Sequence, residues 1–372
     1  MDGGERSPAD AIDGKRRDRS ITNILKLHLL FGGGLDQDRT EPRIPNQQSF
    51  YCRGLSGVSR GPLTVLAQAN GYLRKCFVPG DALYIFAYSR GAATAMCLVD
   101  QIEQDGIEGR DGVWIKPSDT VPSPVVFMGL FDTVHDRRLP KRFTAIPSCV
   151  GHSLHLVALD DNRVSLFPTL LSSPTLVNDP YDDGNGSHLE VWFPGGHGDV
   201  GGGRYRQELS DAALSFMISV VTDPSDFLGP VNRHSTNRLE LMRPEGVWRK
   251  YRHDPESGVL IQTDDLELKP NILGLMHGVD EDLAVRCRCW SAFDPNNFAH
   301  RSLHSATTPT IGVAPILVHI SVLQRAMNDS AYRPANLLDA KFRVVYDDCL
   351  VTDRIYNGLQ EALSDPFLAQ LG

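Results

Sequence analysis

The sequence has no excess of positive charge. Its 372 residues carry 46 acidic and 37 basic side chains, which gives a formal net charge of −9 at pH 7. Proteins that bind nucleic acid through its phosphates normally show basic clusters. The one basic run, residues 15–19, lies in a polar segment. We therefore expect no nucleic-acid partner.

Long apolar runs are also missing. No stretch approaches the ~20 consecutive apolar residues that a transmembrane helix needs, and residues 1–20 contain no apolar segment of the kind that signal peptides carry. We interpret residues 1–20 as a disordered polar tail. A soluble, cytoplasmic protein is expected, with export without a leader and peripheral contact with a membrane left open.

The cysteines show no pattern of pairing. An odd number scattered over a long chain favours reduced thiols, and the seven are Cys52, Cys76, Cys97, Cys149, Cys287, Cys289 and Cys349. Cys287 and Cys289 could suggest a metal or redox pair, but no second pair at zinc-site spacing accompanies them. Free thiols are favoured, and we expect no metal and no cofactor. The sequence does not indicate an oligomeric state.

One stretch combines an apolar run with a serine among small residues. Residues 83–86 run into Ala87-Tyr88-Ser89-Arg90-Gly91, good helix formers follow from residue 92 to 104, and Gly106 is placed to end the helix. This order predicts the strand, turn and helix of a nucleophile elbow with Ser89 at its tip, although Ala87 replaces the first glycine of G-x-S-x-G. The alternative is a serine that caps a helix.

The remaining pattern predicts an α/β fold. Apolar runs indicate strands at residues 24–31, 49–53, 124–131 and 189–193, and helical spacing or composition indicates helices at 63–77, 154–163, 209–221 and 316–327. Strands joined by helical crossovers imply a mainly parallel central sheet with helices on both faces. We assign residues 21–340 to one catalytic domain, with a cap or insertion at about 224–310, and residues 341–372 to a C-terminal extension.

Two further side chains are candidates for a catalytic site. Asp132 follows the strand at 124–131, where an acid could orient a histidine, although an aspartate after a strand is also a common turn former. His197 stands in the glycine-rich segment 194–203. That loop makes sense if the imidazole must be held in one pose. A solvated turn is the alternative, as is a metal site with Asp199 that lacks an evident third ligand.

Three glycines follow the first predicted strand. The backbone N–H groups of Gly32 and Gly33, with that of Arg90 after the serine, could form an oxyanion hole, whereas the alternative is a flexible turn. Residues 179–190 half-match a calcium-binding loop, but a hairpin turn is favoured there. The apolar run 166–171 could line an acyl pocket or form a lid, and core packing is favoured.

Several segments together resemble one family, the catalytic domain of the type VI secretion phospholipase effectors and their uncharacterised bacterial and fungal relatives. The matching segments are 79–92, 129–134, 155–163, 191–203, 209–214 and, more weakly, 318–325, and the most specific is Trp192-Phe193-Pro194-Gly195 with His197 and Asp199-Val200-Gly201-Gly202-Gly203. The Ser…Asp…His order is also that of α/β-hydrolases.

The resemblance implies an α/β-hydrolase-like fold and a serine esterase that cleaves lipid or phospholipid esters. It implies Ser89 as the nucleophile, Asp132 as the orienting acid and His197 as the base. We add Asp199 as a candidate supporting residue. Two positions depart from the family: its Asp-Gly-Thr after the first strand corresponds to residues 32–34 here, and Ala87 replaces a glycine. The alternative is a catalytically silent binding or regulatory module on the same fold.

Overall fold

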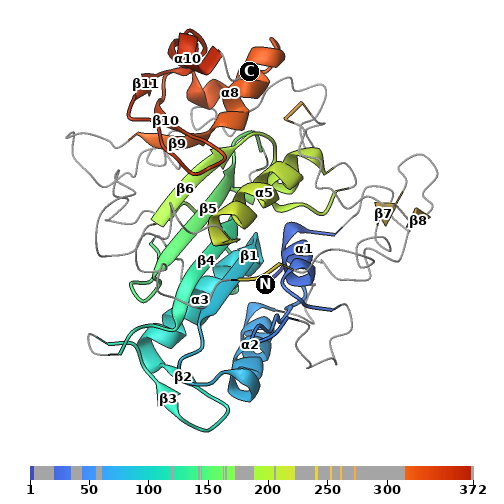
Figure 1. Cartoon of the computed structure of the whole chain (residues 1–372), viewed down its shortest axis with the longest axis vertical. Helices are drawn as coiled ribbons and strands as arrows, with labels where there is room; N and C mark the ends of the chain where they lie inside the picture. Colours follow the sequence, from blue (N-terminus) through green and yellow to red (C-terminus); the bar gives the residue numbers. More distant parts are fainter. Residues whose placement is uncertain are drawn as a thin grey trace.

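A computed structural model describes the chain in segments. They are residues 1–3, 21–34, 44–55, 61–118, 121–140, 143, 145–161, 163, 166–171, 188–204, 207–222, 239–241, 252–253, 260–261, 272–273 and 315–369. The fold is built on a seven-stranded sheet, and the two ends of the chain lie toward opposite ends of it (Figure 1).

The sheet is parallel except at one edge. Its order is β1 (Leu83–Tyr88), β4 (Val125–Phe131), β5 (His152–Ala158), β6 (His188–Phe193), β9 (Ile316–His319), β10 (Lys341–Val345) and β11 (Tyr356–Asn357). Only β10 and β11 pair antiparallel within it. Two small sheets join β2 (Ile107–Glu108) to β3 (Trp114–Ile115) and β7 (Arg252–His253) to β8 (Leu260–Ile261).

Helices cover both faces of this sheet. One apolar cluster contains α1 (Asn23–Leu30) and α5 (Glu208–Thr222), and a second contains α2 (Pro62–Cys76) and α3 (Arg90–Asp105). Phe127 and Phe131 of β4 belong to the first cluster and Met128 and Leu130 to the second, because successive side chains of a strand point to opposite faces. A third cluster lies under β9–β11 with α8 (Ile320–Asn328) and α9 (Leu359–Leu363). The shorter elements are α4 (His197–Gly201), η5 (Ala335–Leu337) and α10 (Pro366–Ala369). The predicted α/β-hydrolase-like architecture is confirmed.

The predicted strand at 24–31 is wrong, because these residues form α1. The Thr22 hydroxyl accepts the Leu25 N–H at 3.2 Å and caps the helix start, and Lys26 pairs with Asp211 of α5 at 2.6 Å in a buried position. Every residue from 23 to 29 is buried. A short run that is apolar on all sides cannot be assigned to strand or helix by periodicity alone.

Three other predicted elements also differ. Residues 154–163 were expected to be helical, but 152–158 form β5, a central strand between β4 and β6. The predicted helix at 316–327 begins four residues late, because 316–319 form β9. Residues 49–53 contain no strand. The predicted helices at 63–77, 92–104 and 209–221 and the strands at 83–86, 124–131 and 189–193 are confirmed.

The described residues cover only part of the predicted domain limits. Met1–Gly3 are buried, and residues 4–20, the rest of the predicted polar tail, lie outside the described residues. The sheet continues across residue 340 into β10 and β11. Most of the predicted insertion at 224–310 lies outside the described residues. Among the helices that are described, none combines the length and the apolar character needed to cross a bilayer.

Two histidines at the start of β5 and β6 should make stability depend on pH. Burial, together with the nearby charge of His188, lowers the pKa of His152 to about 4. An unfolded histidine has a pKa of about 6.5, so between these values the unfolded chain binds more protons, and stability falls as the pH falls. Relative to His152→Gln, which does not titrate, the wild type should lose about 2–3 kcal/mol between pH 7 and pH 4. Urea unfolding at several pH values measures this difference, and a constant difference would contradict it.

Candidate functional site

Ser89 occupies a sharp turn between β1 and α3. Its φ of 58° and ψ of −130° lie in a region that costs a non-glycine residue about 1–3 kcal/mol. The turn is held by the Ser89 N–H, which donates to the Phe131 carbonyl at 3.0 Å, and by the Ser89 carbonyl, which accepts the Val134 N–H at 3.2 Å. A Cβ on Gly91 would lie 2.3 Å from the Asp2 carbonyl oxygen, so only glycine fits there. The predicted elbow geometry is present.

His197 begins α4, directly after β6. Its backbone N–H donates to Asp161 at 2.8 Å, and its carbonyl accepts the Tyr88 hydroxyl at 3.1 Å. The Tyr88 ring also packs against the imidazole, with 4.6 Å between ring centroids. Tyr88 of β1 and Asp161, which follows β5, thus hold the N–H and the carbonyl of His197 and one face of its ring.

Asp132 directly follows β4, and its backbone lies in the left-handed region at a φ of 40°. Its N–H donates to the Leu156 carbonyl at 2.7 Å, and its Oδ1 accepts the Ala158 N–H at 3.0 Å. Both partners belong to the neighbouring strand β5. The carboxylate is completely buried, and Oδ2 remains to face His197.

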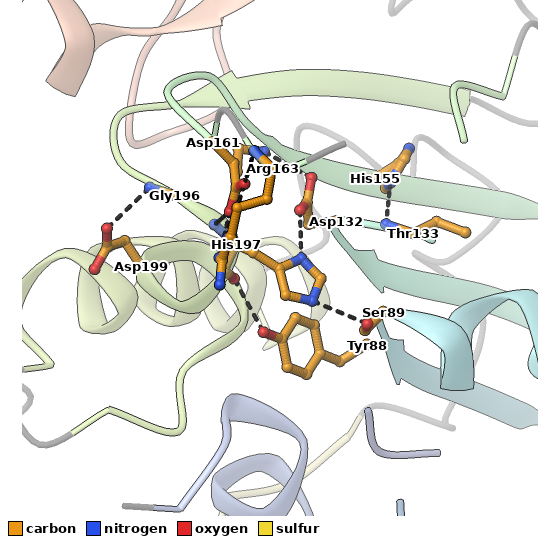
Figure 2. Close-up of polar contacts among 11 residues, drawn as sticks. Tyr88, Ser89, Asp132, Thr133, His155, Asp161, Arg163, Gly196, His197 and Asp199 are labelled. Carbon is orange, nitrogen blue, oxygen red and sulfur yellow. Dashed lines mark hydrogen bonds and ion pairs between the residues drawn. The ribbon is translucent and has the colours of Figure 1, made fainter. Parts of the chain in front are cut away.

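The three predicted side chains meet in one hydrogen-bonded chain (Figure 2). His197 Nδ1 lies 2.5 Å from Asp132 Oδ2, and His197 Nε2 lies 2.9 Å from Ser89 Oγ. A carboxylate only accepts, so Nδ1 carries the proton and Nε2 is free to accept the serine hydroxyl. Ser89, Asp132 and His197 are 4%, 0% and 7% exposed. This arrangement can turn an alcohol into a nucleophile at neutral pH.

Acidic residues after β5 and in α4 shape the turn that carries His197. Burial raises the pKa of Asp160 to about 6, and its carboxylate accepts the Gly195 N–H at 2.7 Å. Asp161 holds the His197 N–H and pairs with Arg163 at 2.5 Å. Asp199, predicted as a supporting residue, accepts the N–H of the cap residue of α4 at 2.9 Å.

The glycines predicted for the oxyanion hole have other partners. The Gly32 N–H donates to the Leu29 carbonyl at 3.2 Å, and the Gly33 N–H donates to the His28 carbonyl at 2.7 Å, which closes the end of α1. Neither N–H is available to a substrate in this conformation. Arg90 is the first residue of α3, and the first N–H groups of a helix have no carbonyl partner within it.

The sequence interpretation missed a segment that lies against the serine. A Cβ on Gly3 would lie 3.2 Å from Ser89 Cβ, so the backbone of residues 2–3 packs beside the nucleophile candidate. The buried Asp2 carboxylate accepts hydrogen bonds from Thr22 Oγ1 at 2.7 Å, from the Tyr51 hydroxyl and from the Gly3 N–H. The sequence did not indicate that residues 2–3 pack beside Ser89, because they begin a polar stretch whose composition is typical of disorder.

The described part of the chain contains no cluster of three or more histidine, cysteine or acidic side chains that could bind a metal ion. It therefore offers no ligand set for the metal alternatives. Residues 179–187 of the half-matching calcium loop, and both Cys287 and Cys289, lie outside the described residues.

Close packing around Tyr88 predicts a large effect of one methyl group. A Cβ on Gly201 would lie 1.9 Å from the Tyr88 ring. Gly201→Ala should therefore lower the free energy of unfolding by about 1–3 kcal/mol, as overpacking does. The matched control is Gly71→Ala in α2, where nothing lies within 4 Å. That change should raise stability by about 0.5–1 kcal/mol. Urea unfolding of both variants tests the pair, and equal effects would contradict the packing account.

Comparison with known proteins gives one family match. Residues 115–220 match the catalytic domain of the type VI secretion system (T6SS) phospholipase effectors, Tle1-like. The matched range includes Asp132 and His197, whereas Ser89 lies upstream of it. This match confirms the resemblance found in the sequence.

Solved structures are also similar to the chain. One of them is the crystal structure of an uncharacterized protein from Pseudomonas aeruginosa, with 20% sequence identity and a TM-score of 0.39 over 68% of this chain. The similarity covers 47% of that protein, so this chain spans less than half of it. No curated protein matches the chain.

Proposed function

We propose that the chain is a serine hydrolase that cleaves carboxylic esters, with lipids or phospholipids as its substrates. The observation that carries the proposal is the buried chain of hydrogen bonds from Ser89 through His197 to Asp132, with distances of 2.9 Å and 2.5 Å. The match of residues 115–220 to phospholipase effectors supports lipid esters as the substrate class.

The geometry supports a two-step acyl transfer. His197 Nε2 takes the Ser89 proton as Oγ bonds to the ester carbonyl carbon, and Asp132 stabilises the imidazolium that forms. The Arg90 N–H, at the N-terminus of α3, stabilises the developing oxyanion. His197 then gives its proton to the leaving alcohol as the ester bond breaks. Water repeats the sequence on the acyl-serine and releases the carboxylic acid.

A substrate panel tests the proposed function. Purified protein should hydrolyse p-nitrophenyl esters and release fatty acid from vesicles of diacyl phosphatidylcholine or phosphatidylethanolamine. Comparison of acyl lengths and head groups then narrows the substrate. The same panel with added chelator tests the metal alternative, since a serine mechanism predicts no effect. A catalytically silent module on the same fold predicts no turnover of any ester.

A further inference from the structure

We propose that His155, held by Glu190, is a positioning residue that fixes Asp132 for its contact with His197. The inference rests on the proposed function for its kinetic consequence, but not for its geometry. It starts from a second buried acid–histidine pair that lies beside the candidate site and touches neither Ser89 nor His197 in any described contact.

The pair joins two neighbouring strands. His155 of β5 and Glu190 of β6 are opposite each other in the parallel register, and His155 Nδ1 lies 2.8 Å from Glu190 Oε2. The imidazole is 1% exposed. The same Glu190 oxygen accepts the Leu171 N–H at 3.0 Å, so this carboxylate is itself held in place.

The other side of the imidazole meets the loop that carries Asp132. The Thr133 N–H donates to His155 Nε2 at 3.1 Å (Figure 2). A ring nitrogen that accepts a hydrogen bond carries no proton, so the proton of neutral His155 is on Nδ1 and is donated to Glu190. The pair therefore fixes the tautomer that Thr133 requires.

This contact acts where the backbone is strained. Asp132 is left-handed at a φ of 40°, a conformation that persists only when its surroundings hold it. The Asp132 N–H donates to the Leu156 carbonyl, and the N–H of the next residue, Thr133, donates to His155. The two peptide groups on either side of the Asp132 Cα are therefore both held. Loss of the second contact lets the peptide rotate and moves the carboxylate away from His197. A misplacement of about 1 Å can cost about 10²-fold in rate.

Two substitutions separate the halves of the pair. In His155→Asn the amide reaches the position of Nδ1, so it can still meet Glu190 but leaves the Thr133 N–H without an acceptor. In His155→Gln the amide reaches the position of Nε2, and its oxygen can accept the Thr133 N–H. We expect His155→Asn to lower kcat by about 10–100-fold with KM little changed, and His155→Gln to recover most of that loss.

The pH profile adds a readout that packing alone would not move. A displaced Asp132 stabilises the His197 imidazolium less, so the acid limb of kcat/KM should shift to lower pH in His155→Asn but not in His155→Gln. Wild-type kcat in His155→Asn would overturn the inference. So would equal kcat losses in both variants without a shift of that limb.

A measurement on the wild-type protein needs neither activity nor a variant. The ¹⁵N NMR shifts of the His155 ring should show a protonated Nδ1 and an unprotonated Nε2, and the reverse tautomer would overturn the inference even if the variants fail to fold.

A second NMR signal compares the variants. The downfield proton of the bond between His197 Nδ1 and Asp132 should be retained in His155→Gln and lost in His155→Asn. If the wild type shows this proton but hydrolyses no ester, the proposed function fails while the positioning role stands.

Discussion

Ser89→Ala is expected to reduce ester hydrolysis by about 10⁴-fold or more, since removal of a nucleophile leaves only the catalysis that binding and the oxyanion donors supply. The change removes one oxygen atom and adds none, so the turn held by Phe131 and Val134 should survive. Steady-state kinetics on a p-nitrophenyl ester, with circular dichroism to verify the fold, measures the effect.

The chain offers a matched control for this serine. Ser153 is also buried, lies on the sheet, and contacts a histidine, with 3.0 Å between its Oγ and His188 Nδ1. It stands at the start of β5 rather than at the end of β1. Ser153→Ala should keep wild-type turnover. Equal losses of turnover in the two variants would contradict a special role of Ser89, because they would show that removing any buried serine hydroxyl has the same effect.

Asp132→Asn should lower kcat by about 10³–10⁴-fold at neutral pH. Both carboxylate oxygens accept hydrogen bonds, Oδ1 from the Ala158 N–H and Oδ2 from His197 Nδ1. An amide must turn its NH₂ group toward one of these donors. Either it loses Ala158, or it forces the His197 proton onto Nε2, where the imidazole cannot accept from Ser89. Either way the negative charge that stabilises the imidazolium is lost.

Asp136→Asn is the control for that change. Asp136 is buried four residues further along, but its carboxylate pairs with Arg138 at 2.7 Å. It should retain wild-type kcat. Wild-type kcat in Asp132→Asn as well would contradict the role assigned to Asp132, whereas loss in both variants would indicate a structural effect on the whole segment.

The sequence predicted that Ser89, Asp132 and His197 lie together, although several of the elements around them were assigned wrongly. Ser89, Asp132 and His197 could be found because each follows an apolar strand, and parallel strands bring their carboxyl ends to one edge of a sheet. Small residues around Ser89 and glycines around His197 marked the turns. None of these signals required knowledge of packing.

The errors arose where a short apolar run had no periodicity. Residues 24–29 are buried on every side as a helix, and 153–158 are buried on both faces as a strand, so neither run shows a clear periodicity. The local signal is the cap that Thr22 places on the helix, and the remaining differences are tertiary: Lys26 pairs with Asp211, and residues 152–158 pair with β4 and β6. The oxyanion assignment of Gly32 and Gly33 depended on a strand that is a helix, and their N–H groups donate to carbonyls of that helix instead.

Residues 1–3 show a different limit. Asp2 is buried only because Thr22 and Tyr51 supply hydrogen bonds to its carboxylate, and those partners lie far along the chain. Burial raises the pKa of Asp2, and its bonds to Tyr51 and Thr22 oppose that effect. No local pattern indicates such a partnership, so a polar stretch is interpreted as a tail.

The account as a whole depends on whether Ser89 is reactive. Incubation with a fluorophosphonate probe, followed by peptide mass spectrometry, measures this directly and requires no knowledge of the natural ester. We predict that the probe adds to Ser89 in the wild type and in Ser153→Ala, and that labelling disappears in Ser89→Ala. An unlabelled Ser89 in folded wild-type protein, or equal labelling after its replacement, would contradict the account.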